Sequence, residues 1–169
     1  MANPLRYTLV SDGPTDRVLI PIIDWVLDQI PSLFERGVQS EIADPRELSR
    51  GSGLSGKISS ALDLYPCDLL FVHRDAESSD DAIRRRRLEE IHEAMQSHSI
   101  CYVPIVPVRM TEAWLLIDRA AICEAAGNPH SGAALLLPPL RRLEDQPDPK
   151  TLLHELLAAA CELHGQRLK

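Results

Sequence analysis

The segment Asp68-Leu-Leu-Phe-Val-His-Arg-Asp75 decides the fold, because it places four consecutive apolar residues directly before a polar cluster. A short apolar run bounded by turn residues is typical of a strand buried on both faces of a parallel sheet. Parallel strands need long crossover connections, which are usually helices. The segment therefore predicts an α/β domain in which this strand is central.

The chain before and after this segment carries the expected alternation of strand and helix patterns. Pro104 and Pro107 lie within one predicted strand and indicate an edge or a bulge, because proline cannot donate to a ladder. Asp148 followed by Pro149 predicts the start of a last helix. The expected strands are 5–11, 68–72 and 100–108, with a short extended piece near 34–42, and the expected helices are 18–30, 57–64, 80–97, 112–120 and 149–163.

The chain has 169 residues, which predicts one compact domain with room for a small appendage. We expect a three-layer α/β domain over residues 1–126 with a mostly parallel central sheet. Residues 127–169 hold several prolines and one helical pattern. They predict a Pro-rich loop and a C-terminal helix packed on the same domain.

The net charge of −7 argues against a protein that coats nucleic acid through a general basic surface. Asp12 interrupts the N-terminal segment before an apolar leader core develops, and no apolar run approaches the ~18 residues of a membrane helix. We therefore expect a cytoplasmic protein without a membrane partner.

Acidic residues follow the predicted strands at the points where the strands end. Ligands of open parallel sheets bind beyond the carboxyl ends of the strands, so these side chains are candidates for one site. A cluster of carboxylates is tolerated where it holds a cation, and oxygen ligands suit Mg²⁺ or Mn²⁺. The candidate metal ligands are Asp12, Asp75, Glu77 and Glu112, and Asp16 lies in the first turn of the helix that follows Asp12.

A glycine-rich segment, Gly51-Ser-Gly-Leu-Ser-Gly56, precedes Lys57 and nearly spells a Walker A loop. Ile58 occupies the position of the Mg²⁺-binding hydroxyl, and no apolar strand precedes the segment, so we favour a flexible loop before a helix. Lys57 near that helix start is a candidate for contact with a substrate phosphate.

Two further features have a structural and a functional interpretation. The run Arg84-Arg-Arg-Arg87 fans around a helix rather than forming one stripe, which favours a solvated helix with ordinary ion pairs over a phosphate-binding patch. His73 stands beside the candidate acids and could ligate metal or carry a proton. We favour a partly buried, hydrogen-bonded histidine at the end of the strand.

Three motifs in order resemble a known family. They are Asp12-Gly-Pro-Thr-Asp16, Arg74-Asp-Ala-Glu77 and the stretch 106–116 around Glu112-Ala-Trp, and the segment 148–154 adds a fourth point of likeness. They resemble the Toprim fold, particularly small bacterial Toprim-like proteins of unknown function related to the nuclease domains of overcoming-lysogenization-defect proteins. The resemblance spans most of the chain.

In that family a Glu-Gly turn follows the first strand and an Asp-x-Asp follows a later one, and together they bind divalent metal for phosphodiester chemistry. The resemblance places Asp12 at the glutamate, and Asp75 with Glu77 at the Asp-x-Asp. Each of these sites departs conservatively from the family, by one methylene of side-chain length. Glu112 matches the family's glutamate before Ala-Trp, and Asp16 matches an acid after the turn.

We therefore expect metal-dependent phosphoryl transfer, in the form of a nuclease-like hydrolase that acts on nucleic acid or another phosphodiester. Asp12, Asp75, Glu77 and Glu112 would hold Mg²⁺ or Mn²⁺, and Asp12, Glu112 or Asp16 would take the catalytic positions beside the reacting water. Two alternatives stay open. One is a non-catalytic metal or partner-binding module of a larger, defence-type assembly, and the other is an ATPase that uses the loop 51–57.

Overall fold

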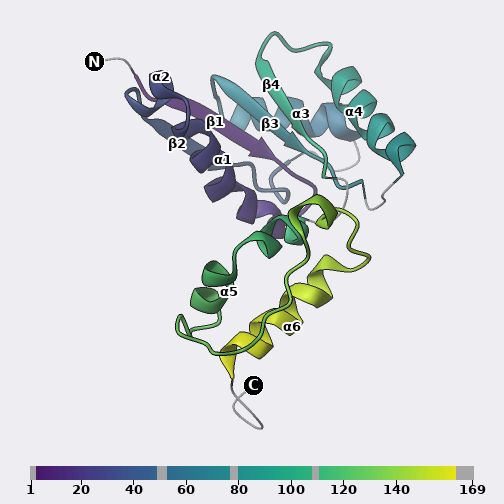
Figure 1. Ribbon diagram of the computed structural model, residues 1–169. Coiled ribbons are helices and arrows are strands. Elements are labelled where there is room, and N and C mark those ends of the chain that lie inside the picture. The colour runs from purple at the N-terminus through teal and green to yellow at the C-terminus, as the bar shows by residue number, and fades with distance from the viewer. Residues whose placement is uncertain (1–2, 49–52, 77–79, 108–110, 163–169) are drawn as a thin grey trace. The chain divides into compact units, whose positions relative to one another are not determined.

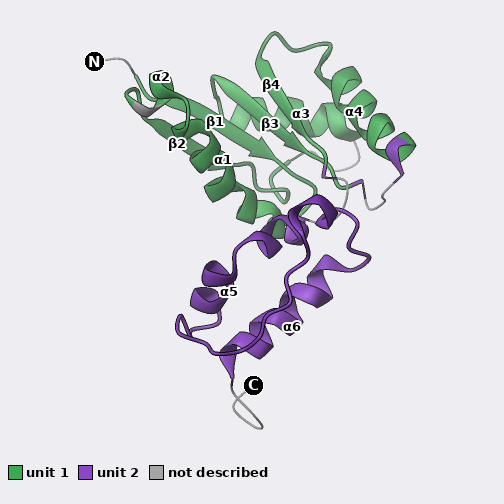
Figure 2. Cartoon of the chain, in the orientation of Figure 1, with its two compact units in different colours: residues 1–75, 82–106 green, residues 76–81, 107–169 purple. Residues whose placement is uncertain are grey.

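The computed structural model describes residues 3–48, 53–76, 80–107 and 111–162 of the chain. The chain divides into two compact units (Figure 2). The first unit comprises residues 1–75 and 82–106, and the second comprises residues 76–81 and 107–169. Among the described residues, no helix has the length and apolar character needed to cross a membrane.

The first unit contains a sheet of four parallel strands in the order β2-β1-β3-β4 (Figure 1). The strand bounds are Leu5–Val10 for β1, Val38–Ile42 for β2, Leu69–His73 for β3 and Cys101–Ile105 for β4. The segment that predicted a central strand forms β3, which pairs with β1 on one side and β4 on the other.

Helices cover both faces of this sheet, which confirms the predicted three-layer α/β architecture. A right-handed crossover from β1 to β2 and one from β2 to β3 run in opposite directions along the sheet, so their helices lie on opposite faces. In Figure 1, α1 lies in front of β1 and β2, and α3 lies behind the sheet. The helices of this part of the chain are the short 3-10 helix η1 (Pro14–Val18), α1 (Leu19–Asp28), α2 (Pro31–Phe34), α3 (Gly53–Leu64) and α4 (Asp81–Met95).

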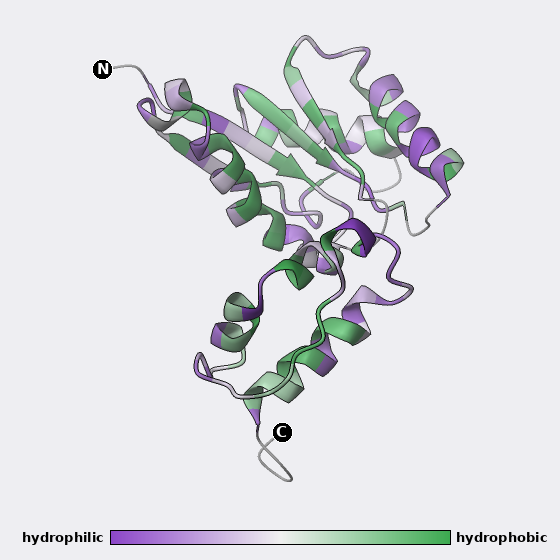
Figure 3. Ribbon diagram, viewed as in Figure 1, coloured by the Kyte–Doolittle hydropathy of each residue, from purple (hydrophilic) through white to green (hydrophobic). Residues whose placement is uncertain are grey.

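The core of the first unit lies between the sheet and these helices. Leu9, Leu70 and Val72 are fully buried, and the ring of Tyr7 meets that of Phe71 edge-on at 5.2 Å. Figure 3 shows the contrast between the mainly hydrophobic β3 and the largely hydrophilic α4. A strand covered on both faces must be apolar on both, which explains the continuous apolar run that marked β3 in the sequence.

Local sequence signals set several of the boundaries. β4 is an edge strand as expected, and it accommodates Pro104 opposite Val72 of β3. It ends at Ile105, which makes it shorter than the predicted strand 100–108. The helix expected from residue 57 begins at Gly53, so residues 53–56 are helical rather than part of a flexible loop.

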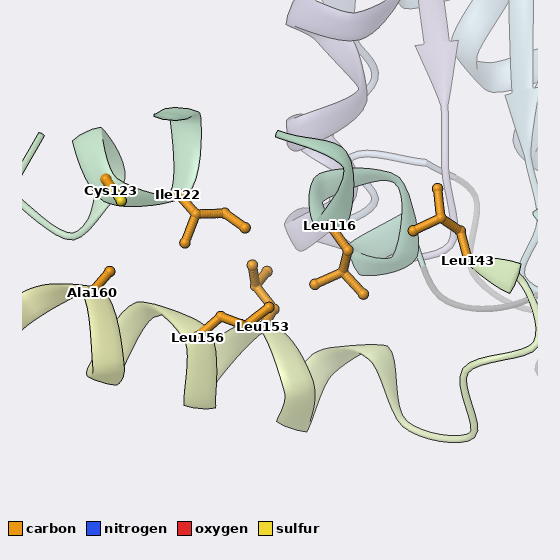
Figure 4. Close-up of a cluster of buried hydrophobic side chains, with 7 residues drawn as sticks. All are labelled: Leu116, Ile122, Cys123, Leu143, Leu153, Leu156 and Ala160. Carbon is orange, nitrogen blue, oxygen red and sulfur yellow. The ribbon is translucent and has the colours of Figure 1, made fainter. Parts of the chain in front are cut away.

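The second unit is helical and has its own core. It contains the 3-10 helix η2 (Thr111–Ile117), α5 (Arg119–Ala125), the 3-10 turn η3 (Leu140–Arg142) and α6 (Pro149–Cys161). Figure 4 shows side chains of η2 and α5 meeting those of α6. The buried cluster consists of Leu116, Ile122, Cys123, Leu143, Leu153, Leu156 and Ala160.

Capping side chains explain where the helices of the second unit begin. Asp148 accepts a hydrogen bond from the amide of Thr151 at 2.9 Å and starts α6, as predicted. The helix expected over 112–120 is instead a 3-10 helix followed by α5. Asp118 separates the two, because its carboxylate accepts a hydrogen bond from the amide of Ala120 at 2.7 Å and caps α5.

The division after Val106 differs in position from the domain boundary expected after residue 126. Residues 111–125 belong with the C-terminal segment because η2 and α5 pack against α6. The packing expected of residues 127–169 on the sheet domain stays a prediction.

Candidate metal centre

The carboxyl ends of β1 and β3 lie next to each other in the sheet. From β1 the chain continues to β2, which lies on one side of β1. From β2 it crosses back to β3, which lies on the other side of β1. The connections therefore diverge between β1 and β3, which is where open α/β sheets bind ligands. Asp12 follows β1 at this position, and Arg74 and Asp75 follow β3.

The turn after β1 holds Asp16 in a fixed position. The Ser11 hydroxyl donates a hydrogen bond to the carbonyl of Gly13 at 3.0 Å, and the Gly13 amide donates to Asp16 Oδ2 at 3.0 Å. Asp16 is consequently a buried carboxylate at the start of η1, with an exposed fraction of 8%. Its side chain points toward the end of β3 rather than into solvent, since the same Oδ2 also meets His73.

His73 is the last residue of β3 and is completely buried. Its Nδ1 lies 3.2 Å from Asp16 Oδ2, and because an ionised carboxylate only accepts, Nδ1 carries the hydrogen of this bond. Its Nε2 lies 3.4 Å from Asp75 Oδ1 without the geometry of a hydrogen bond. Nε2 is thus a buried polar atom with no hydrogen-bond partner among the described residues.

The two carboxylates control the protonation of His73. Burial of the ring favours the neutral form, but the hydrogen bond with Asp16 and the attraction to Asp16 and Asp75 outweigh it and raise the pKa of His73 to about 9. Burial likewise tends to raise the pKa of Asp16. The hydrogen bonds from His73 and the Gly13 amide more than offset this effect, so the pKa of Asp16 is lowered.

Arg74 links the turn after β1 to helix α4. Its Nε donates to Asp12 Oδ2 at 2.9 Å, and its guanidinium lies 3.4 Å from Glu90 on α4. Glu90 also accepts from Arg87 at 2.9 Å and lies 3.6 Å from Arg86. The Asp12 carboxylate is therefore engaged in an ion-pair network next to the buried histidine.

The histidine and its two acidic neighbours could hold a metal ion. One candidate ligand atom from each of Asp16, His73 and Asp75 lies within 4.8 Å of the others. Two ligands of one cation with bonds of about 2.1 Å are separated by roughly 3.0–3.4 Å in octahedral or tetrahedral geometry. The 3.4 Å between His73 Nε2 and Asp75 Oδ1 fits this range.

The hydrogen bond between His73 Nδ1 and Asp16 also suits a metal-binding role for His73. Metal-bound histidines usually donate their second ring N–H to a carboxylate, which fixes the tautomer and the orientation of the ring. Asp16 occupies that place relative to Nδ1. The unpartnered Nε2 and the acceptor on Nδ1 therefore both fit a cation held between His73 and Asp75.

The structure brings together only some of the acids selected from the sequence. Asp75 and Asp16 belong to the candidate metal group, and Asp12 lies beside it through Arg74. Glu77 lies outside the described residues. Glu112 lies on η2 in the second unit, and its role in the site stays a prediction.

Lys57 and His73 were the two other residues that the sequence singled out. Lys57 is the fifth residue of α3 and partly exposed, whereas a lysine of a Walker A loop opens its helix directly after a glycine loop. The burial and the hydrogen bond favoured for His73 from the sequence are confirmed, and the alternative, a metal ligand, is compatible with its place in the candidate metal group. Its place at the end of the central strand, two residues before Asp75, was the signal available in the sequence.

Comparisons with known proteins leave the family open. Neither a protein-family model nor a curated protein matches the sequence significantly. One solved structure is similar in part: the TIR domains of the activated Roq1 resistosome that directly recognises the pathogen effector XopQ. That match has 15% sequence identity, covers 95% of this chain and 86% of the other, and has a TM-score of 0.31, which is too low to support an argument.

Proposed function

We propose that this protein binds a divalent cation through His73 Nε2 and Asp75 Oδ1 and uses it to hydrolyse a phosphodiester bond in nucleic acid. The observation that carries the proposal is the buried Nε2, which lacks a hydrogen-bond partner and lies 3.4 Å from a carboxylate. A buried polar atom without a hydrogen-bond partner is costly in a folded protein, and a cation that displaces the Nε2 proton would be bound by both the ring and the Asp75 carboxylate. The order of the acidic motifs along the chain, which resembles that of Toprim nucleases, supports the phosphodiester part.

The donor set favours Mn²⁺ over Mg²⁺. An imidazole nitrogen is a poor ligand for Mg²⁺, which prefers six oxygens, whereas Mn²⁺ accepts both nitrogen and oxygen. Two protein ligands leave several positions for water and for substrate oxygens.

The residues around the cation would divide the work of hydrolysis. A bound divalent ion supplies a Lewis acid for the phosphate and lowers the pKa of a coordinated water. Asp16 holds the imidazole through Nδ1, so it is a positioning residue. Asp12 is the nearby carboxylate that would orient or deprotonate the attacking water, and Arg74 would share its guanidinium between Asp12 and a phosphate oxygen.

Binding of Mn²⁺ tests the first half of the proposal. Electron paramagnetic resonance of free Mn²⁺ should show saturable binding to the wild type and at least about tenfold weaker binding to Asp75→Asn and His73→Gln. Asp68→Asn is the matched control, because Asp68 precedes the same strand at its opposite end and accepts a hydrogen bond from the Arg6 amide. Equal affinity of wild type and Asp75→Asn would show that the site is an ion-pair cluster without a metal.

Cleavage of nucleic acid tests the second half. Single-stranded DNA and RNA oligonucleotides with a fluorescent end label should be cut in Mn²⁺, and the activity should be lost with a chelator and in Asp75→Asn. Intact Mn²⁺ binding without cleavage of either polymer contradicts the hydrolytic role and favours the non-catalytic metal module.

A further inference from the structure

A cavity of about 510 Å³ lies in the first unit between the start of η1 and the end of β2. Pro14 and Arg17 line it from η1, and Ile42, Pro45 and Tyr65 line it from the other side. A second cavity of about 490 Å³ adjoins it and shares Arg17, Ile42 and Tyr65. The two cavities therefore form one groove along η1, with a size typical of small-molecule sites.

This groove and the candidate metal centre share the helix η1. Asp16 faces His73 within the protein, whereas its neighbour Arg17 is exposed and lines the groove. A ligand in the groove would thus lie against the same short helix that positions the metal-centre histidine. The two sites remain chemically separate, because none of the groove-lining residues belongs to the metal group.

The charges of the groove leave one cation available. Asp44 and Arg46 pair with each other at 2.6 Å, and the Tyr65 hydroxyl donates a hydrogen bond to Glu47. Arg17 forms no hydrogen bond or ion pair with a residue that the structure describes, although its charge attracts Asp44 and helps to lower the pKa of that carboxyl. The N–H donors of its guanidinium are therefore open to a phosphate group in the groove.

The remaining lining is suited to a flat ring. Pro14, Ile42 and Pro45 provide apolar surface, and the hydrogen bond to Glu47 holds the aromatic ring of Tyr65. Nucleobases stack on aromatic and apolar side chains of this kind. The apolar side chains and Arg17 of this groove thus combine the features that recognise a base and a phosphate.

We propose that the groove binds one nucleotide, with its phosphate on Arg17 and its base against Tyr65 and the proline surfaces. The groove would hold one nucleotide of the nucleic-acid substrate. This assignment therefore rests on the proposed function and names the class of substrate that the protein takes. The acidic side chains Glu41, Asp44 and Glu47 in the lining disfavour a second phosphate group inside the groove, so the groove fits one nucleoside monophosphate unit rather than a nucleoside polyphosphate.

Calorimetric titration with adenosine 5′-monophosphate in the presence of a chelator tests the assignment without the metal. We expect saturable binding to the wild type and about tenfold weaker binding to Arg17→Ala, since a charge-assisted contact is lost. Arg36→Ala is the charge-matched control with unchanged affinity. Arg36 lies before β2 at the other end of the sheet, where it donates to the carbonyl of Asn3.

The readouts separate this groove from the metal centre. Asp75→Asn should bind the nucleotide as the wild type does, and the δ1-methyl resonance of Ile42 should shift on titration. Adenosine and inorganic phosphate should each bind at least about tenfold more weakly than the nucleotide, because each makes only half of the contacts. If Mn²⁺ binding fails while nucleotide binding persists, the proposed function falls and the nucleotide site stands.

Three results would overturn the assignment. They are an absence of saturable nucleotide binding, an affinity of Arg17→Ala equal to that of the wild type, and inorganic phosphate binding as tightly as the nucleotide. The last result identifies a simple anion contact at Arg17 rather than a nucleotide site.

Discussion

His73 Nδ1 donates a hydrogen bond to Asp16 Oδ2 across 3.2 Å and so joins two residues that lie 57 positions apart in the chain. The bond connects the end of β3 to the first turn of η1. It fixes the ring so that the opposite nitrogen, Nε2, faces Asp75 Oδ1. The orientation of one buried ring thereby depends on a carboxylate that is not itself required as a ligand.

Asp16→Asn should weaken Mn²⁺ binding by roughly ten- to a hundredfold, because an amide holds the imidazole less firmly than a carboxylate does. Isothermal titration calorimetry of Mn²⁺ against the variant measures the change. Asp148→Asn is a useful control, since it weakens the cap of α6 in the second unit and leaves the metal group intact. Loss of Mn²⁺ affinity in both variants would show that general destabilisation, rather than ring positioning, is responsible.

The stability of the metal-free protein should decrease as the pH rises. The pKa of His73 is about 9 in the folded state against an ordinary value of 6.5. Its stabilising effect is therefore complete below pH 6.5 and is lost as the pH rises through about 9. Urea unfolding at a series of pH values in a chelator measures this loss.

His73→Asn provides the reference for that series. Its amide group can donate to Asp16 but carries no charge, so the part of the pH dependence that belongs to His73 should disappear. A variant whose stability follows the same pH profile as the wild type would mean that His73 is neutral at physiological pH.

Tyr7→Phe should destabilise the first unit by about 1–2 kcal/mol. The buried Tyr7 hydroxyl donates to Asp24 Oδ1 at 2.8 Å, and burial together with that carboxylate raises the pKa of Tyr7. Tyr102→Phe is the comparison, because its hydroxyl meets His92 at an exposed position. Chemical denaturation of both variants should show the larger loss for Tyr7→Phe, and equal losses would count against a buried hydrogen bond at Tyr7.

Leu156→Ala should destabilise the second unit by about 2–5 kcal/mol, because it leaves a cavity between α6 and the residues of η2 and α5. Leu136→Ala removes the same atoms from a side chain that is 85% exposed and should have little effect. Thermal unfolding followed by calorimetry compares the two. A similar midpoint for both variants would contradict a packed core at Leu156.

Local sequence patterns determined much of the fold. The apolar run 69–72 predicted a central strand, Pro104 predicted an edge strand, and Asp148 predicted the start of α6, and the structure confirms each. These features depend on the chemistry of a few adjacent residues, so they are visible without tertiary information. The α-helix expected after Thr111 was wrong because the Asp118 cap starts a new helix there.

The same patterns placed acids at strand ends but did not show which of them meet. Asp12 and Asp75 were selected because each follows a strand. The partnership of Asp12 with Arg74, and the approach of the His73 ring to Asp16, required the strand order. A histidine next to candidate acids looks the same in a sequence whether its ring is buried or solvated.

The sequence by itself thus determined the α/β class, the central strand and the edge, since each follows from local hydrophobicity, proline chemistry or capping. Only the tertiary structure decided the strand order, which brings β1 beside β3 and unites Asp16 with His73. The physical reason is that strand order depends on long-range pairing and on the burial shared between distant segments. Such long-range contacts cannot be predicted from the residues that neighbour each partner in the sequence.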